Sequence, residues 1–167
     1  MDQFIGRIIR LLGKILHINI TEELQQKLTQ FIKFCLVGVT NTAVHLAVKF
    51  IVLAVVHRLF PDFEYAYVPA NAVAFVVSVY WSFIWNSRTV FHLDTKDKSV
   101  RRKALVKSYL CYGLTSVLLN SLLDTLWIKG LGIDEHISSL MNLAVTIPVN
   151  YLTNKKFAFS AVRKQKG

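Results

Sequence analysis

The sequence predicts an all-α integral membrane protein: four transmembrane helices in two tandem hairpins, an amphipathic interfacial helix at the N-terminus, and both termini in the cytoplasm. Of the 167 residues 53% are hydrophobic and 18% charged, and the mean hydropathy is +0.42, which is too apolar for an ordinary soluble domain. Four long stretches are almost free of charge. The net charge of +10 is concentrated in the segments that flank alternate stretches. This distribution favours an anionic membrane surface over nucleic acid as the partner.

The first 30 residues form an arm that precedes the apolar stretches. Its polar residues recur at spacings of three and four, leaving the other helix face to Ile, Leu and Phe; they are Gln3, Arg7, Arg10, Lys14 and His17. A cleavable signal keeps its charge ahead of an unbroken apolar core. We therefore expect an amphipathic helix on the cytoplasmic leaflet, with its basic face towards anionic lipid. The alternative is that the arm docks on a partner protein. Residues 21–23, Thr-Glu-Glu, predict the start of a second helix that leads into the first span.

The apolar stretches are long enough to cross a bilayer as helices. A helix needs about 20 residues to span about 30 Å of hydrocarbon, and its backbone amides must be satisfied within the segment. The expected spans are residues 31–56, 65–87, 104–128 and 137–154. The transmembrane domain then covers residues 31–160, and residues 161–167 form a basic tail.

The basic residues predict the orientation of these spans. Seventeen of the 20 Lys and Arg residues lie before the first span or at its mouth, around the connection between the second and third, or after the fourth. The positive-inside rule places these segments, and with them both termini, in the cytoplasm. The other two connections hold only Arg58 and Lys129 as cations.

The two halves of the domain match each other. An offset of 75 aligns the third span with the first, and an offset of 68 aligns the fourth with the second. The second alignment pairs residues at the ends of the spans: Asn86 with Asn154, Arg88 with Lys156, and Phe91 with Phe159. A repeat of two spans re-enters the membrane in the same orientation, so we expect a parallel repeat about an axis along the membrane normal.

Polar residues recur at steps of four within each span. Such a step keeps side chains on one helical face, and polar side chains in a span usually face the bundle interior or a wet cavity. We therefore expect a polar seam between the helices, formed by Asn41, His45, Ser78, Ser82, Ser116, Asn120, Thr146 and Asn150. The alternative is that these groups only join helices by hydrogen bonds, worth about 0.6 kcal/mol each.

Lys49 and Asp124 occupy matched positions in the two halves. A lone charge at mid-helix costs about 2.5 to 3.5 kcal/mol on an insertion scale, so we expect the two to meet as an intramembrane ion pair. The alternative is that each extends separately to the outer interface. Pro148 in the fourth span predicts a kink. Cys35 and Cys111 have neither disulfide nor metal-site spacing and are expected to be buried apolar residues.

Three segments carry a family resemblance: residues 31–42 (FIKFCLVGVTNT), 82–91 (SFIWNSRTVF) and 150–159 (NYLTNKKFAF). Together they resemble the GtrA-like family of small four-helix membrane proteins, over about residues 30 to 160. The resemblance implies translocation of a polyprenyl-phosphate-linked sugar, such as an undecaprenyl-phosphate sugar, across the bacterial cytoplasmic membrane. It also implies a membrane glycosyltransferase as partner, and O-antigen, teichoic acid or another cell-wall polysaccharide as the acceptor.

The residues offer a physical basis for such a function. An unpaired charge buried in hydrocarbon costs tens of kcal/mol on a Born estimate, so a phosphate headgroup needs a polar route while its tail stays in lipid. Arg88 and Lys156 are our candidates for first contact with the phosphate, with Asn86 and Asn154 hydrogen-bonding beside them. The alternative is that both cations only anchor the orientation of the protein.

Two functions of different classes remain. The first is a carrier, or flippase, for the lipid-linked sugar. The second is a non-transporting subunit that recruits or stabilises a glycosyltransferase through the arm and the basic segment 96–107. We expect no enzyme, metal or cofactor, because paired carboxylates, a His and Cys constellation and a Gly-rich phosphate loop are all missing from the sequence. Four short helices enclose little volume, which favours a homo-oligomer.

Overall fold

The computed structural model describes residues 2–62, 65–93, 95 and 97–160, and the described chain is helical with short connections and no strand. The first half contains three α-helices and a π-helical segment: α1 (Asp2–Ile15), α2 (Glu22–Leu59), α3 (Tyr67–Trp85) and η1 (Asn86–Val90). The second half alternates α- and π-helix: α4 (Lys98–Leu114), η2 (Thr115–Leu119), α5 (Asn120–Asp124), η3 (Thr125–Gly130), α6 (Glu135–Thr153) and η4 (Asn154–Ala158).

The expected start of the second helix is confirmed. Thr21 is the N-cap of α2, and its hydroxyl accepts a hydrogen bond from the amide of Leu24 at 3.2 Å. Two glutamates occupy the first turn, where a carboxylate is favoured by the helix dipole. The helix then continues for 38 residues, a length of about 57 Å. The surface segment and the first expected span are therefore one continuous helix.

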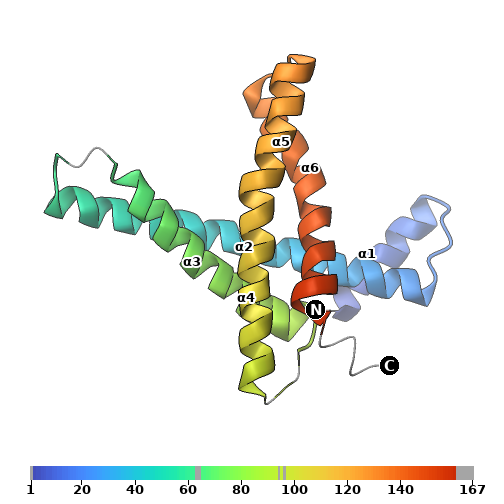
Figure 1. The fold of residues 1–167 in the computed structure, drawn as a ribbon. Coiled ribbons are helices and arrows are strands. Elements are labelled where there is room, and N and C mark those ends of the chain that lie inside the picture. Colours follow the sequence, from blue (N-terminus) through green and yellow to red (C-terminus); the bar gives the residue numbers. More distant parts are fainter. Residues whose placement is uncertain (1, 63–64, 94, 96, 161–167) are drawn as a thin grey trace.

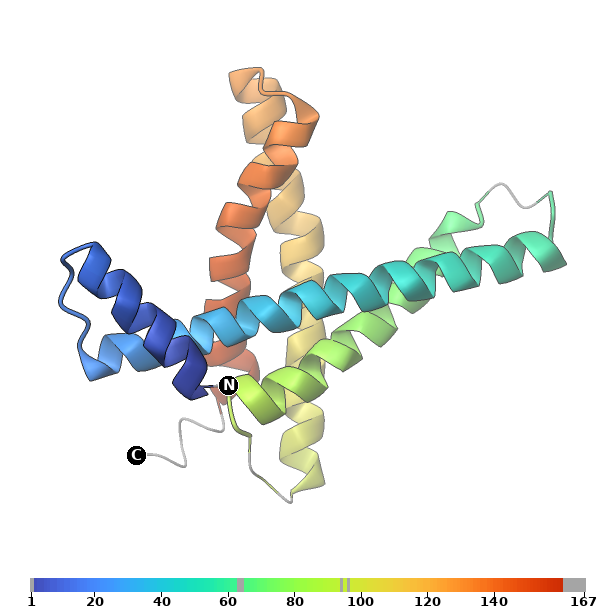
Figure 2. The ribbon, with the colours of Figure 1, turned by 180° about the vertical axis from the view of Figure 1, so that it is seen from behind.

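The two hairpins cross. In Figures 1 and 2, α2 and α3 run side by side along one arm, while the helices from α4 to α6 form a second arm that stands across it. The arms meet near the ends that carry η1 and η4, and their outer ends point away from each other. The expected seam between the hairpins is therefore closed at one end and diverges towards the other.

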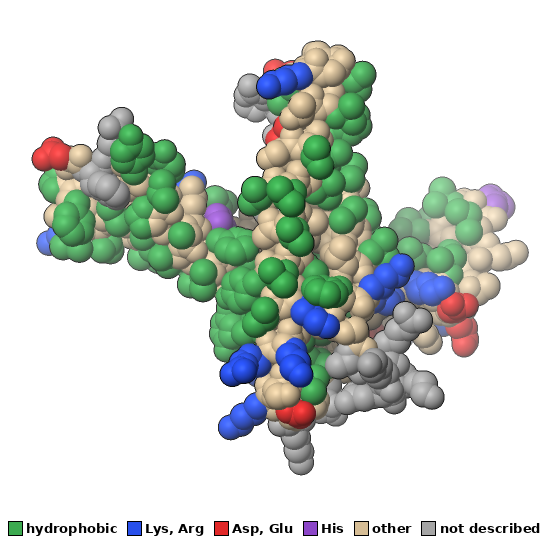
Figure 3. Space-filling model, viewed as in Figure 1, with side chains coloured by type: hydrophobic (Ala, Val, Ile, Leu, Met, Phe, Trp, Pro, Cys, Tyr) green, Lys and Arg blue, Asp and Glu red, His purple; other side chains and the backbone are tan. Residues whose placement is uncertain are grey.

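Two helical segments are long and apolar enough to cross a membrane, Glu22–Leu59 and Tyr67–Val90. The third and fourth expected spans lie on the helices of the second arm, and α6 remains α-helical through Pro148. Figure 3 shows hydrophobic side chains spread along both arms on the face in view, with Lys and Arg gathered around the lower end of α4 and the crossing. The number of spans and the side of the termini stay predictions.

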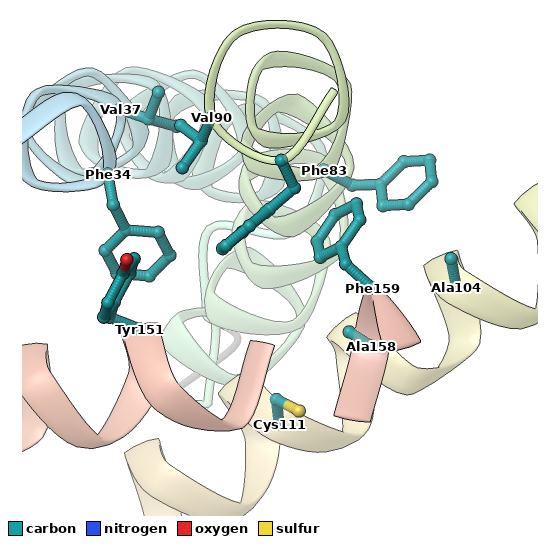
Figure 4. Packing of buried hydrophobic residues seen from close by; sticks show 10 residues of the cluster. Phe34, Val37, Phe83, Val90, Ala104, Cys111, Tyr151, Ala158 and Phe159 are labelled. Atoms are coloured by element: carbon teal, nitrogen blue, oxygen red, sulfur yellow. The ribbon is translucent and has the colours of Figure 1, made fainter. Parts of the chain in front are cut away.

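The hydrophobic core lies where the arms meet, and we call it the joint. Its buried residues come from both hairpins (Figure 4): Phe34, Val37, Phe83, Val90, Phe91, Ala104, Cys111, Tyr151, Ala158 and Phe159. Phe91 and Phe159 stack at 4.5 Å between ring centroids, and Phe83 stacks on Phe159 at 5.8 Å. Aromatic pairs at these separations add to the packing between helices. The joint thus holds together chain segments that are far apart in the sequence.

The N-terminal helix α1 folds back against the beginning of α2. Ile5 and Ile9 are buried, and Asp2 forms a salt bridge with Lys33. A second apolar strip of α1 is exposed, formed by Phe4, Leu11, Leu12 and Ile15. The amphipathic helix is confirmed as a helix, while its contact with lipid stays a prediction.

Candidate functional site

Both hairpins end in a π-helical turn of the same kind. The amide of Phe91 donates to the carbonyl of Asn86 at 2.8 Å, and the amide of Phe159 donates to that of Asn154 at 2.9 Å. These bonds span five residues, and the offset of 68 places one turn on the other. Single π-turns are rare among helical turns, and those that occur are often found at functional sites. The offset found in the sequence therefore relates two segments that share an unusual backbone conformation, while the repeat of the two halves stays a prediction.

Asn86 and Asn154 begin these turns and are 1% and 0% exposed. The Asn86 amide donates to Ser82 Oγ at 3.0 Å, and that of Asn154 donates to the carbonyl of Asn150 at 2.9 Å. The side-chain carbonyl oxygens of both residues are buried without a hydrogen-bond partner among the described residues. An unsatisfied buried acceptor costs about 1 to 3 kcal/mol. The structure therefore places both amides inside the joint, where they hold the turns.

The expected phosphate contacts Arg88 and Lys156 are both exposed, on η1 and η4. Lys156 lines a cavity of about 710 Å³, which we call the entry cavity, whereas Arg88 does not line it. The cations of this cavity are Lys27, Lys155 and Lys156, and its other walls are largely apolar: Leu28, Phe31, Phe91, Tyr151, Leu152 and Phe159. The arrangement offers positive charge and a lipid-like surface side by side.

Lys155, which was not expected from the sequence, is the cation of this cavity that is held by two hydrogen bonds. Its ammonium donates to Gln30 Oε1 at 2.6 Å and to the Tyr151 hydroxyl at 3.0 Å. The Tyr151 hydroxyl in turn donates to Gln30 Oε1 at 2.8 Å, and the Gln30 amide donates to the carbonyl of Val90. The offset of 68 pairs Lys155 with Ser87, so the comparison of the two halves does not indicate a second cation equivalent to Lys155. The four-residue step from Tyr151 to Lys155 was the available signal.

A second cavity, of about 410 Å³, adjoins the entry cavity, and we call it the lysine pocket. It shares four lining residues with the entry cavity: Lys27, Gln30, His92 and Lys155. Lys33 also lines it and is only 5% exposed. Its ammonium lies 2.9 Å from Asp2 Oδ1. The hydrogen bond from Lys33 lowers the pKa of the Asp2 carboxyl below its usual value, although partial burial opposes this shift.

Half of the expected seam residues line one cavity of about 440 Å³ between α2 and the second hairpin: Asn41, Asn120, Thr146 and Asn150. Others join helices directly. His45 Nδ1 lies 3.4 Å from Ser78 Oγ, and Ser82 Oγ lies 2.9 Å from the Tyr112 hydroxyl. The side chain of Ser116 lies outside the described residues. Both interpretations of the polar stripes are thus represented, a polar cavity and hydrogen bonds between helices.

The structure does not bring Lys49 and Asp124 together. The Asp124 carboxylate accepts hydrogen bonds from Ser138 Oγ at 2.8 Å and from the Asn142 amide at 2.7 Å. Lys49 lies on α2, and in the part of the chain that the structure describes α2 makes no contact with α5. The physical reason is the divergence of the arms, which separates matched positions far from the joint.

The described residues hold no cluster of three His, Cys, Asp or Glu side chains that could bind a metal. Two apolar helices of membrane-spanning length, hydrophobic side chains on the surface and a cationic end point to a helical membrane protein. The chain belongs to the GtrA/DPMS transmembrane-domain family, whose model matches residues 33–159. This confirms the resemblance and fits a membrane function related to polyprenyl-phosphate sugars. No curated protein and no solved structure gives a significant match to the chain.

Proposed function

We propose that this protein binds the headgroup of a polyprenyl-phosphate-linked sugar at the entry cavity and carries it across the bacterial cell membrane, as a multi-pass flippase for cell-surface polysaccharide or teichoic acid glycosylation. The entry cavity is the observation that supports this most directly. Its volume of about 710 Å³ is that of a small-molecule site. Its lining combines three Lys side chains with aromatic and aliphatic walls, which suits a ligand that is a phosphate at one end and an isoprenoid at the other.

The cations supply the recognition of phosphate. Lys155 is held in place by Gln30 and Tyr151, so little side-chain entropy is lost when an anion binds. Lys156 is exposed next to it and is free to contact the outer face of the headgroup. Charge-assisted hydrogen bonds are roughly twice as strong as neutral ones. In this proposal Arg88 attracts the anion from the opposite π-turn without lining the cavity.

The route across the membrane follows α2. The entry cavity is lined by residues 27–31 of that helix, and the seam cavity of about 440 Å³ is lined by residues 34–42. Phe34 and Tyr151 of the joint lie between them, with ring centroids 5.5 Å apart. Passage of a sugar therefore requires the joint to open. Asn41, Thr146 and Asn150 then offer amides and hydroxyls to the sugar, while the tail stays in lipid outside the seam.

The matched π-turns support the parallel repeat as part of this proposal. Two equivalent hairpins around one joint allow alternate opening to either side by movement of one hairpin against the other. A second copy of the chain would close the diverging outer halves, so a homo-oligomer and a partner glycosyltransferase belong to the same proposal.

The test is movement of a labelled polyprenyl-phosphate sugar from one face of liposomes that contain the purified protein. Substitution of both Lys155 and Lys156 by Gln is expected to reduce the rate at least about tenfold, since each charge-assisted bond is worth about 1.5 to 3 kcal/mol. The Arg88→Gln, Lys156→Gln pair tests the contacts expected from the sequence. The matched control is Lys98→Gln with Lys103→Gln, which removes two exposed cations of α4 that do not line the entry cavity. Equal rates in all variants would contradict the proposed site.

The second candidate is a non-transporting subunit that recruits or stabilises a glycosyltransferase. The exposed apolar strip of α1, which includes Phe4, Leu11 and Ile15, favours it because such a strip is able to pack on another protein. No lipid movement in liposomes, combined with loss of glycosyltransferase activity on deletion in cells, would support this function instead.

A further inference from the structure

Lys33 is a buried cation whose partner comes from a separate helix. The residue is 5% exposed and sits near the start of α2, at the mouth of the first expected span. Both carboxylate oxygens of Asp2 approach its ammonium, at 2.9 and 3.2 Å. This is the one ion pair that Lys33 makes among the described residues. A buried ammonium without an anion is strongly unfavourable, so Lys33 requires Asp2 or a replacement for it.

The surroundings of this ion pair are rich in basic side chains. Lys27, Lys155 and His92 line the same lysine pocket, and Glu23 is the other acidic residue there. Glu23 is itself paired with Lys27, at 2.6 Å on the exposed side of α2. Lys155 lines both the lysine pocket and the entry cavity. An anion that entered past Lys155 would therefore reach Lys33 if Asp2 moved away.

The helix that supplies Asp2 is attached along one narrow strip, in which Gly6 lies close to Gln25 and Gly13 lies close to Ile20. Ile5 and Ile9 are its buried apolar side chains, and the Asp2 side chain is 61% exposed. Arg10 adds one hydrogen bond, to Gln25 Oε1 at 2.6 Å. Elements with few buried contacts open at low free energy. The exposed apolar strip of α1 also gives the helix an alternative place to lie, on the membrane surface.

We propose that Lys33 is an inner phosphate-binding residue, and that Asp2 occupies the phosphate position in the empty protein. A phosphate monoester or diester on a lipid displaces the Asp2 carboxylate, pairs with Lys33 and releases α1 from α2. The identity of the ligand as a polyprenyl phosphate rests on the proposed function. The anion site itself rests on the burial of Lys33 and on the cations around it.

The proposal has a measurable thermodynamic consequence. An internal anion that must be displaced lowers the apparent affinity by the fraction of molecules in which the site is open. Removing the charge of Asp2 therefore raises the affinity for phosphate, whereas removing that of Lys33 lowers it. A purely structural ion pair predicts neither change.

The experiment measures binding of a polyprenyl phosphate to the full-length protein in phosphatidylcholine nanodiscs by calorimetry. Asp2→Asn is expected to tighten binding about threefold to tenfold, because the ligand no longer has to displace a carboxylate from Lys33. Lys33→Gln is expected to weaken it at least about tenfold in both the wild-type and the Asp2→Asn background, because a buried charge contact is lost. Lys33→Arg, which keeps the charge, retains binding and shows that position 33 tolerates substitution.

Two matched pairs of variants separate the inference from general effects on charge or folding. Asp62→Asn, the counterpart of Asp2→Asn, removes an exposed carboxylate that lines neither cavity and leaves affinity unchanged. Ile9→Ser loosens α1 without altering charge and tightens binding, whereas Leu12→Ser, at an exposed position of the same helix, does not. Unchanged affinity in Asp2→Asn, or full binding in Lys33→Gln, would overturn the inference.

Inorganic phosphate distinguishes a lipid headgroup from free phosphate as the ligand. If Asp2→Asn binds inorganic phosphate as tightly as the lipid form, the lipid assignment is overturned. Binding is read without transport, so the inference and the proposed function fail separately. If the protein binds through Lys33 but moves no lipid, the anion site is supported and the carrier function is contradicted. If the protein moves lipid and neither Asp2 nor Lys33 affects binding, the carrier function is supported and the anion site is contradicted.

Discussion

The two hairpins are alike at the joint and different in their outer halves. Each ends in a π-turn that begins at a buried Asn and is followed by a Phe, and the two Phe rings stack. Beyond the joint, α2 and α3 are uninterrupted α-helices, whereas the helix from Lys98 to Gly130 changes to π-helix twice, at η2 and η3. The ends thus share one conformation, and the outer halves do not.

The hydrogen bonds that join the helices within each hairpin also differ between the two hairpins. In the second hairpin, Asp124 joins α5 to α6 through Ser138 and Asn142. In the first, α2 and α3 are joined by longer contacts, such as His45 Nδ1 with Ser78 Oγ at 3.4 Å and the Trp81 indole with Thr40 Oγ1 at 3.2 Å. Because π-turns are sites where helices bend, we infer that the second hairpin is the one that deforms, and that its polar contacts limit the deformation. The following predictions test this difference, from the largest expected effect to the smallest.

Phe159→Ala tests the joint that both hairpins share. The ring is 2% exposed and stacks on Phe83 and Phe91, so we expect a loss of about 3 to 5 kcal/mol in the free energy of unfolding. The measurement is reversible unfolding in mixed micelles by SDS titration. Phe50→Ala, at a position 64% exposed on α2, is the control and should change stability by less than about 1 kcal/mol. Equal losses would show that the joint is not the common core.

Asp124→Leu tests the polar contacts of the second hairpin. Two hydrogen bonds to a carboxylate are lost, and we expect unfolding to become easier by about 2 to 3 kcal/mol. Asp124→Asn, which still accepts a hydrogen bond, should lose less. The same SDS titration gives both values, and a larger loss for Asn than for Leu would contradict the assigned role.

A double-mutant cycle of Lys49→Met with Asp124→Leu tests whether charges couple the two hairpins. The structure separates these residues, so the coupling should be within about 0.5 kcal/mol, as for distant sites. A coupling above about 1 kcal/mol would instead support the ion pair expected from the sequence, and would require the outer halves to approach each other in the membrane.

His45→Ala tests the first hairpin. The contact with Ser78 is long, at 3.4 Å, and hydrogen bonds between membrane helices average about 0.6 kcal/mol. We expect a loss of that size, with no further loss in a His45→Ala, Ser78→Ala double variant. A loss as large as that of Asp124→Leu would remove the difference between the hairpins.

Acid should release α1 from the first hairpin. The Lys33 ammonium lowers the pKa of Asp2, so the contribution of this carboxylate to docking is fully present above its unfolded pKa of about 4 and is lost as the pH falls through the lower folded value. Besides Lys33, the charged or titratable side chains that line the same pocket are Lys27, Lys155, His92 and Glu23.

The distance between spin labels at exposed positions 11 and 36, in a background with both native cysteines replaced, measures this release. It should remain constant from neutral pH to about pH 5 and lengthen below about pH 4. In Asp2→Asn the distance should not depend on pH in this range. Release in the wild-type protein already near neutral pH would contradict the role of Asp2.

Much of the fold could be predicted because local signals and tertiary structure agree. Thr21 caps α2 because a hydroxyl before two glutamates satisfies free amides in any surroundings. The equivalence of Asn86 and Asn154 was visible as an offset, and the structure adds the π-turns. Nothing in the sequence distinguishes a π-turn from an α-turn, because the two differ only in which backbone carbonyl accepts the hydrogen bond of the amide.

The candidate site was predicted less well. The sequence indicated Lys156 but not Lys155, because Lys155 acquires its importance from Gln30, which is 125 residues away. It also indicated Lys49 as the partner of Asp124. In the structure, the Asp124 carboxylate instead accepts hydrogen bonds from two neighbouring polar groups, Ser138 and Asn142. The pairing of Asp2 with Lys33 was also missed, since periodicity describes faces of α1 but not the helix on which it packs.

The sequence by itself determined the helical class, the apolar segments, the beginning of α2 and the matched ends of the hairpins, because these depend on hydrophobicity and hydrogen bonding within a few residues. Only the tertiary structure decided which cations share a cavity, which anion covers Lys33 and how far the two arms diverge. Those features depend on the crossing angle of the hairpins, which side-chain packing at the joint sets and which no local pattern encodes.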